Sequence, residues 1–154
     1  MLKIFGTDGI RCRVNQEPMT VDTCLKIAKA AGYILSNNVQ KKNRVIISKD
    51  TRLSGYQYEP LITSGFVSMG IDVVLIGPLP TSALPILIRS LRADMGVMIT
   101  ASHNTYEYNG LKFFDSEGNK ISKALEKKIE NIISVKKNMI EFQLMIMSLG
   151  KLLD

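Results

Sequence analysis

Short apolar segments of strand length alternate with longer segments of helical periodicity along most of this chain, and this alternation strongly restricts the possible folds. Residues 44–48, 72–76 and 95–99 are mostly apolar and partly β-branched, and segments with helical spacing separate them. Strands that are apolar throughout are typical of parallel sheets covered on both faces. The sequence therefore predicts an α/β fold with a mixed, largely parallel sheet sandwiched by helices.

The same patterns predict the positions of the other elements. Residues 1–6 have a strand-like pattern, and residues 110–114 are expected to form a further strand before a turn. Helices are expected at residues 20–37, 54–69, 81–91 and 122–133.

The chain has 154 residues, 45% of them hydrophobic and 22% charged, which is enough for one folded domain with its own core. We expect this domain at residues 1–134. Residues 135–154 are apolar and rich in methionine, and we expect a tail or linker there. There is no apolar run near the roughly 20 residues that cross a bilayer and no secretory leader, so we expect no membrane partner and a cytoplasmic location.

Charge and cysteine content exclude some kinds of site. Cys12 and Cys24 lack C-x-x-C spacing and the chain has one histidine, so a zinc cluster is not expected and both cysteines are predicted to be free thiols. The formal net charge is +6. The densest basic stretches have no interleaved aromatic residues, which disfavours a nucleic-acid partner; that weaker alternative predicts steeply salt-dependent binding.

Four loops carry a set of groups suited to binding phosphate. They comprise residues 5–11, 49–55, 77–81 and 100–112, and in a doubly wound sheet such loops can gather at one edge. Glycine backbone N–H groups can approach an anion there. The glycines at positions 6 and 9 do not fit a dinucleotide fingerprint and no P-loop is present, which disfavours nucleotide binding. The cations that these loops offer are Arg11, Lys49, Arg52 and Lys112.

Ser102 follows the apolar segment at residues 95–99 and could carry a phosphoryl group. A serine hydrolase triad is disfavoured, because neighbours in extended sequence point to opposite faces, no G-x-S-x-G elbow exists and His103 is the single histidine. Simpler interpretations stay open for each residue: a turn cap for Ser102, a packed His103, and solvent-facing cations at Arg11 and Lys112.

Taken in chain order, these loops resemble the motifs of the α-D-phosphohexomutase superfamily, and most closely those of its bacterial members that act on glucosamine phosphates. The resemblance covers residues 1–134. It rests on Phe-Gly-Thr-Asp-Gly-Ile-Arg at residues 5–11, Lys-Asp-Thr-Arg-Leu-Ser-Gly at 49–55, Gly-Pro-Leu-Pro-Thr at 77–81, and Thr-Ala-Ser-His-Asn with Asn-Gly-Leu-Lys-Phe-Phe at 100–104 and 109–114.

The resemblance implies an isomerase that converts glucosamine 6-phosphate to glucosamine 1-phosphate through a bisphosphorylated sugar. Phosphorylated Ser102 would donate and regain the phosphoryl group, and its phosphate would supply one ligand to a catalytic Mg²⁺. Arg11 and Lys112 would stabilise that group and assist proton transfer, while His103 would shape the serine loop. The other substrate and phosphate-loop positions implied are Thr7, Gly9, Asn104, Asn109, Lys49 and Arg52.

This chain departs from the superfamily pattern at Thr105, where proline is usual, and at Cys12, where glycine is usual. It also matches only the first of four domains. The remaining Mg²⁺ ligands and the sugar-recognition loop lie in the other three, so the chain alone is expected to be inactive. Residues 139–153 would then expose apolar surface and favour self-association. A mutase for mannose or glucose phosphates and a non-catalytic phosphosugar-binding remnant are the alternatives.

Overall fold

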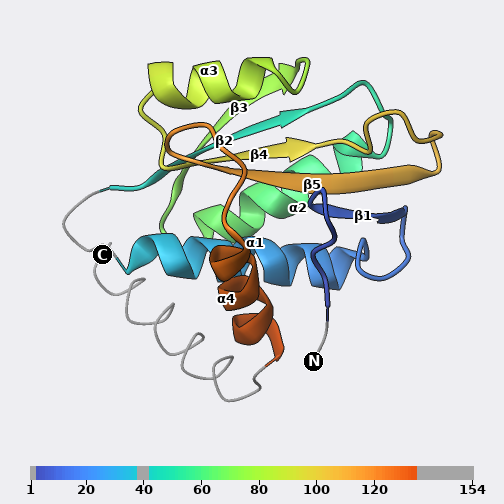
Figure 1. Ribbon diagram of the computed structural model, residues 1–154, viewed down its shortest axis with the longest axis horizontal. Helices are drawn as coiled ribbons and strands as arrows, with labels where there is room; N and C mark the ends of the chain where they lie inside the picture. Colours follow the sequence, from blue (N-terminus) through green and yellow to red (C-terminus); the bar gives the residue numbers. More distant parts are fainter. Residues whose placement is uncertain (1–2, 38–41, 135–154) are drawn as a thin grey trace.

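A computed structural model describes residues 3–37 and 42–134 of the chain (Figure 1). Within those residues, five strands form one sheet in the order β1-β5-β4-β2-β3. Strand β2 pairs in parallel with β3 and β4, whereas β5 runs antiparallel to β4 and β1. The elements are β1 (Ile10–Arg13), α1 (Val21–Ser36), β2 (Arg44–Lys49), α2 (Gly55–Val67), β3 (Asp72–Pro78), α3 (Ala83–Ser90), β4 (Met95–Ile99), β5 (Tyr108–Asp115) and α4 (Lys123–Ser134).

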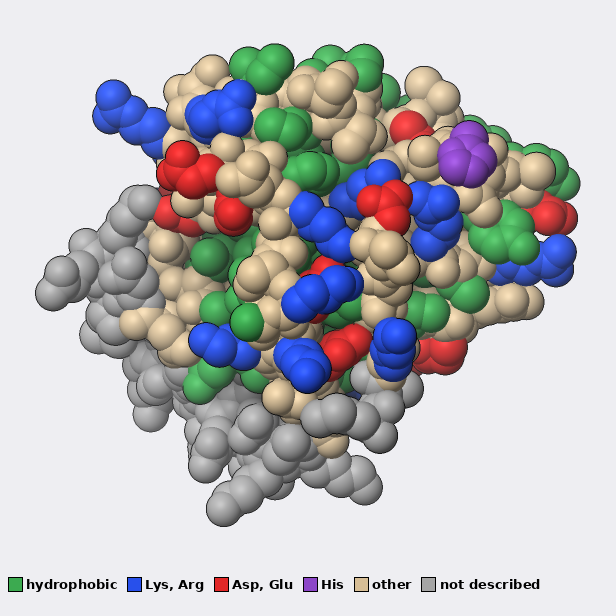
Figure 2. Space-filling model, viewed as in Figure 1, with side chains coloured by type: hydrophobic (Ala, Val, Ile, Leu, Met, Phe, Trp, Pro, Cys, Tyr) green, Lys and Arg blue, Asp and Glu red, His purple; other side chains and the backbone are tan. Residues whose placement is uncertain are grey.

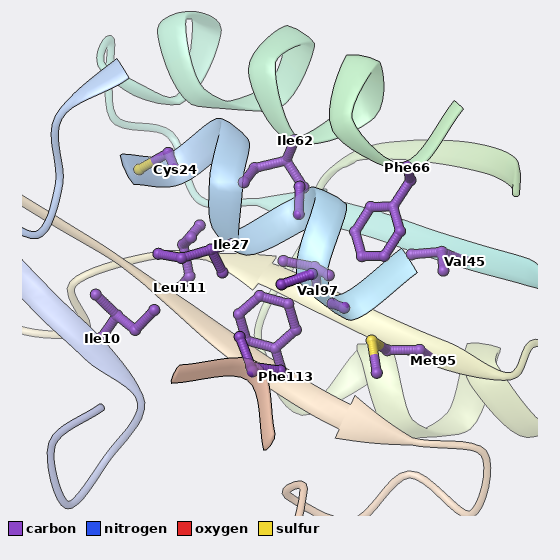
Figure 3. Close-up of a cluster of buried hydrophobic side chains, with 14 of the residues drawn as sticks. Ile10, Cys24, Ile27, Val45, Ile62, Phe66, Met95, Val97, Leu111 and Phe113 are labelled. Carbon is purple, nitrogen blue, oxygen red and sulfur yellow. The ribbon is translucent and has the colours of Figure 1, made fainter. Parts of the chain in front are cut away.

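Helices cover both faces of this sheet, which confirms the predicted α/β fold (Figure 1). Val45 and Ile47 of β2 pack in a core with residues of α1, α2 and α4, whereas Ile46 between them packs in a second core with residues of α3. Side chains alternate between the two faces of a strand, so an all-apolar strand needs a cover on each side. Figure 3 shows the larger core, with Phe66 and Phe113 among its labelled side chains.

Helices α1 and α2 pack closely because Gly65 lies at their contact. A Cβ atom added to Gly65 would lie 2.4 Å from the Cβ of Ala28. Helix α3 approaches β4 in the same way, since a Cβ on Gly96 would lie 2.3 Å from Ile88. Glycine at these two positions therefore sets the distance between α1 and α2 on one face of the sheet and between α3 and β4 on the other.

The strand-like pattern at residues 1–6 was misleading, because among the described residues the first strand is Ile10–Arg13. The backbone N–H groups of Ile4 and Phe5 donate to Glu130 Oε1 of α4, at 2.7 and 2.9 Å, instead of to a neighbouring strand. The expected tail at residues 135–154 lies outside the described residues. In the described part of the chain, every helix is too short or too polar to cross a membrane.

Candidate active site

The loop that carries Ser102 connects the end of β4 to the start of β5. The Thr100 N–H donates to Gly110 O at 3.0 Å, so the first residue of the loop is still tied to β5. Ser102 is exposed and has a φ of +56°, in the left-handed region that residues other than glycine seldom adopt. Such a conformation persists only where the surrounding contacts impose it.

Arg52 holds the carbonyl groups of this loop. Its Nη1 donates to Thr105 O at 2.6 Å and to Tyr108 O at 3.1 Å, and its Nη2 donates to Ser102 O at 3.0 Å and to Asn104 O at 2.7 Å. Its Nε donates to Asp50 Oδ2 in the same loop as Arg52. A guanidinium has five N–H donors, and all five are used. Arg52 therefore holds the serine loop, and in this geometry it has no donor left for the phosphate that the sequence assigned to it.

Ser102 and His103 lie on the same side of the loop. Ser102 Oγ is 3.4 Å from His103 Nδ1, a long contact in which either group can be the donor. The expectation that these neighbours point apart was wrong, because it assumed extended backbone, and the left-handed φ of Ser102 removes the alternation of faces. Next to them is an open hollow whose rim carries Leu53 and Tyr106, with exposed fractions of 85% and 83%.

Arg11 and Lys112 lie on one face of the sheet, on the neighbouring strands β1 and β5. Arg11 pairs in register with Gly110, and Lys112 is two residues further along β5, so both side chains project to the same side. Asp8 Oδ2 joins them, at 3.0 Å from Arg11 Nη2 and 3.0 Å from Lys112 Nζ. The hydrogen bond from Lys112 lowers the pKa of Asp8, and the positive charges of Lys112 and Arg11 add to that effect.

Arg11 also connects this group to the serine loop, because its Nη1 donates to Asn104 Oδ1 at 3.1 Å. The close pairing of β1 with β5 depends on two glycines. A Cβ on Gly9, whose φ is +85°, would lie 2.5 Å from Leu111 O, and a Cβ on Gly110 would lie 2.2 Å from Ile10 O. Gly9 thus allows the strand approach that brings Arg11 beside β5.

Helix α4 holds the N-terminal loop that carries Asp8. Glu126 is buried and interacts with Lys120 Nζ at 3.4 Å and with Lys123 Nζ at 2.6 Å. These two lysines donate to the carbonyl groups of Thr7 and Gly6. Lysine and arginine side chains gather over this region, in the middle of the face shown in Figure 2. Of the predicted site residues, Thr7 takes part in these contacts through its backbone oxygen, which accepts from Lys120.

Two predicted site residues are buried in structural contacts. Lys49 has an exposed fraction of 5%, forms a short ion pair with Glu59 and lies 4.0 Å from the centre of the Tyr56 ring. Asn109 is fully buried; its Nδ2 donates to Ser54 Oγ at 2.8 Å. The structure thus does not bring the charge of Lys49 to the exposed part of the serine loop.

The sequence interpretation omitted Asp8 as a site residue, although it links two of the predicted cations. The signal was present, because Asp8 lies three residues before Arg11 in a glycine-flanked loop, but the partner Lys112 is distant in sequence. Among the residues with a described structure, no three acidic, cysteine or histidine side chains cluster to hold a metal ion. The resemblance implies one Mg²⁺ ligand from this domain, the phosphate on Ser102, and the described residues by themselves do not supply the near-octahedral oxygen coordination that Mg²⁺ needs.

Comparison with known proteins shows which sequences this chain is similar to. Residues 2–139 match the profile described as phosphoglucomutase/phosphomannomutase, alpha/beta/alpha domain I. The chain is 55% identical over 130 residues to the phosphoglucosamine mutase of Rhodospirillum rubrum, and 49% identical over 132 residues to that of Chlamydia pneumoniae. These segments cover 84% and 86% of this chain but 28% and 29% of the relatives.

Solved structures agree with the sequence matches. A putative phosphomannomutase from Thermus thermophilus superposes with a TM-score of 0.76 at 35% identity, covering 84% of this chain and 29% of the other. A phosphoglucomutase/phosphomannomutase family protein from Burkholderia thailandensis superposes with a TM-score of 0.71 at 26% identity, with the same coverage. In each case the match is to under a third of the larger protein.

Proposed function

The chain belongs to the phosphoglucomutase/phosphomannomutase family through its α/β/α domain I, and from this premise we propose that it is the phosphoserine-carrying domain of a phosphoglucosamine mutase. The observation that carries the proposal is the exposed Ser102, which has a left-handed backbone conformation and lies in a loop whose carbonyl groups accept hydrogen bonds from Arg52. The names of the relatives at about half identity support glucosamine phosphate as the substrate.

In the proposed reaction, phosphorylated Ser102 gives its phosphoryl group to the 1-hydroxyl group of glucosamine 6-phosphate; this hydroxyl group loses its proton, and the freed Ser102 Oγ gains one. The resulting bisphosphate turns around and returns its 6-phosphoryl group to Ser102, whose hydroxyl group loses its proton while the freed 6-oxygen gains one. Glucosamine 1-phosphate is released. Positioning and charge stabilisation supply most of the catalysis in phosphoryl transfer, so a fixed serine loop is what this domain has to provide.

Arg11 and Lys112 are the cations that we propose act on the transferring group. Asp8 holds both ammonium and guanidinium groups at 3.0 Å, and an arriving phosphate can exchange with this exposed carboxylate for the same donors. His103 Nδ1 lies near enough to Ser102 Oγ to orient the hydroxyl group. Mg²⁺ would neutralise charge on the phosphoryl group, and it would need carboxylate ligands beyond the described residues.

A hybrid enzyme tests the proposal. In it, this chain replaces the matching N-terminal segment of the Rhodospirillum rubrum relative, and conversion of glucosamine 6-phosphate is measured. We expect an active hybrid, loss of activity with Ser102→Ala, and full activity with Ser116→Ala, an exposed serine in the turn after β5. Mannose and glucose phosphates serve as competing substrates.

A folded but inactive hybrid, or equal activity with Ser102→Ala, would contradict the proposal. The isolated 154-residue chain is expected to show no mutase turnover, because one carried phosphate and a few cations do not hold a sugar and Mg²⁺ in reactive geometry. Turnover by the isolated chain would show that its residues suffice for the reaction.

A further inference from the structure

Thr100 connects the Ser102 backbone to strand β2 through its hydroxyl group. The Ser102 N–H donates to Thr100 Oγ1 at 2.9 Å, and Thr100 Oγ1 donates to Asp50 Oδ2 at 2.7 Å. Thr100 is 3% exposed. Asp50 lies one residue after the end of β2, and its N–H donates to Ile99 O at 3.1 Å, so the carboxylate is held beside the end of β4.

The Asp50 carboxylate fixes the direction of the two hydrogen bonds that link it through Thr100 to Ser102. Asp50 also accepts from Arg52, at 3.0 Å from the backbone N and 2.9 Å from Nε. An ionised carboxylate only accepts, so the Thr100 hydroxyl must donate to it. The lone pairs of Thr100 Oγ1 are then free to accept from Ser102. Because the Thr100 hydroxyl proton points to Asp50, the hydroxyl oxygen faces the Ser102 N–H as an acceptor.

We propose that Asp50 and Thr100 are positioning residues that impose the left-handed conformation of Ser102 and thereby orient Ser102 Oγ for phosphoryl transfer. The conformational part stands on the contacts above, and the catalytic part rests on the proposed function. Arg52 fixes the carbonyl groups of the loop, whereas Thr100 fixes the one N–H group that decides the φ of Ser102. Without the hydrogen bond from Ser102 N–H to Thr100 Oγ1, nothing at this N–H offsets the conformational free energy that a left-handed serine costs.

Nuclear magnetic resonance of the 154-residue chain tests the conformational part. The three-bond coupling between the amide and α protons of Ser102, its Cα and Cβ shifts and its amide exchange rate report the left-handed state. Thr100→Val removes the hydroxyl group at nearly constant shape and should abolish that signature. Thr100→Ser should keep it. Thr63→Val is the matched control, because it removes a hydroxyl that donates elsewhere, to Glu59 O at 2.7 Å.

Asp50→Asn adds a test of the second bond. The amide of this variant has one acceptor oxygen in place of two, so it cannot replace every bond that Asp50 accepts from Thr100 and Arg52. Thr100 is then held less firmly, and the Ser102 signature should weaken. If Thr100→Val or Asp50→Asn leaves the coupling, shifts and exchange rate of Ser102 unchanged in a folded chain, the proposal is overturned. Cα and Cβ shifts across the strands establish that each variant is folded.

Kinetics in the hybrid enzyme test the catalytic part. Thr100→Val should lower kcat by about 10- to 100-fold with little change in KM, because a displaced nucleophile loses reactive geometry rather than substrate contacts. Thr100→Ser should restore the rate. If Thr100→Val loses the Ser102 signature but leaves kcat unchanged, the catalytic part of the proposal is refuted and the conformational part stands. An inactive hybrid with unmutated Thr100 would count against the proposed function, while the resonance result would still decide the conformational part.

Discussion

Replacing Arg52 with alanine should release the serine loop and destabilise the domain measurably. The change removes four hydrogen bonds from the guanidinium to carbonyl groups of the loop. Water can reach these carbonyl groups once the side chain is gone, so each bond is worth roughly 0.5–1 kcal/mol rather than the full value for a buried charged group. The free energy of unfolding should therefore fall by roughly 2–4 kcal/mol.

Urea denaturation followed by circular dichroism measures this change, and a loss of that size moves the unfolding midpoint by about 1–2 M. Arg52→Lys should recover only part of the loss, because an ammonium cannot span acceptors arranged for a planar fork. Arg89→Ala is the matched control: Arg89 is exposed and donates to one carbonyl group, that of Glu117, at 2.9 Å. The reasoning is refuted if Arg52→Ala costs no more than Arg89→Ala.

Three further outcomes are expected. Gly65→Ala should cost about 1–3 kcal/mol in urea denaturation, because its Cβ would lie 2.4 Å from a methyl carbon of α1. Burial raises the pKa of Cys24 to about 12, so a thiol reagent at mildly alkaline pH should label Cys12 in the native chain and Cys24 only after unfolding. Asp8 has a folded pKa below its ordinary 3.8, so its pairing with Lys112 stabilises the fold at neutral pH. The stability difference between the native chain and Asp8→Asn should vanish as acid titrates Asp8 through its folded pKa; a difference that persists in acid would contradict this.

The fold was predictable because local signals agreed with the tertiary structure. The central residues of β2, Val45–Ile47, are all apolar because helices cover the strand on both faces, and Thr20 caps α1 by accepting from Thr23 N. The position of β1 was not predictable. Its sequence, Ile-Arg-Cys-Arg, is short and largely polar, and it becomes a strand by pairing with β5, about a hundred residues later.

The sequence identified candidate residues of the site but not the contacts that they make. Ser102, Arg11 and Lys112 were picked out by loop position, and the structure places Arg11 and Lys112 on one sheet face. The tasks of Lys49 and Arg52 depend on partners that no local pattern identifies, namely Glu59 on α2 and the carbonyl groups of a loop fifty residues away. A cation near the serine loop therefore need not face the exposed side of that loop.

Phosphopeptide mapping of the protein purified from its own cells tests the central claim most directly. The account predicts a phosphoryl group on Ser102, lost on incubation with an excess of glucosamine 6-phosphate and restored by glucosamine 1,6-bisphosphate. Ser116, exposed in the turn after β5, should stay unmodified throughout. A Ser102 that carries no phosphate from its cells and gains none from the bisphosphate would contradict the account.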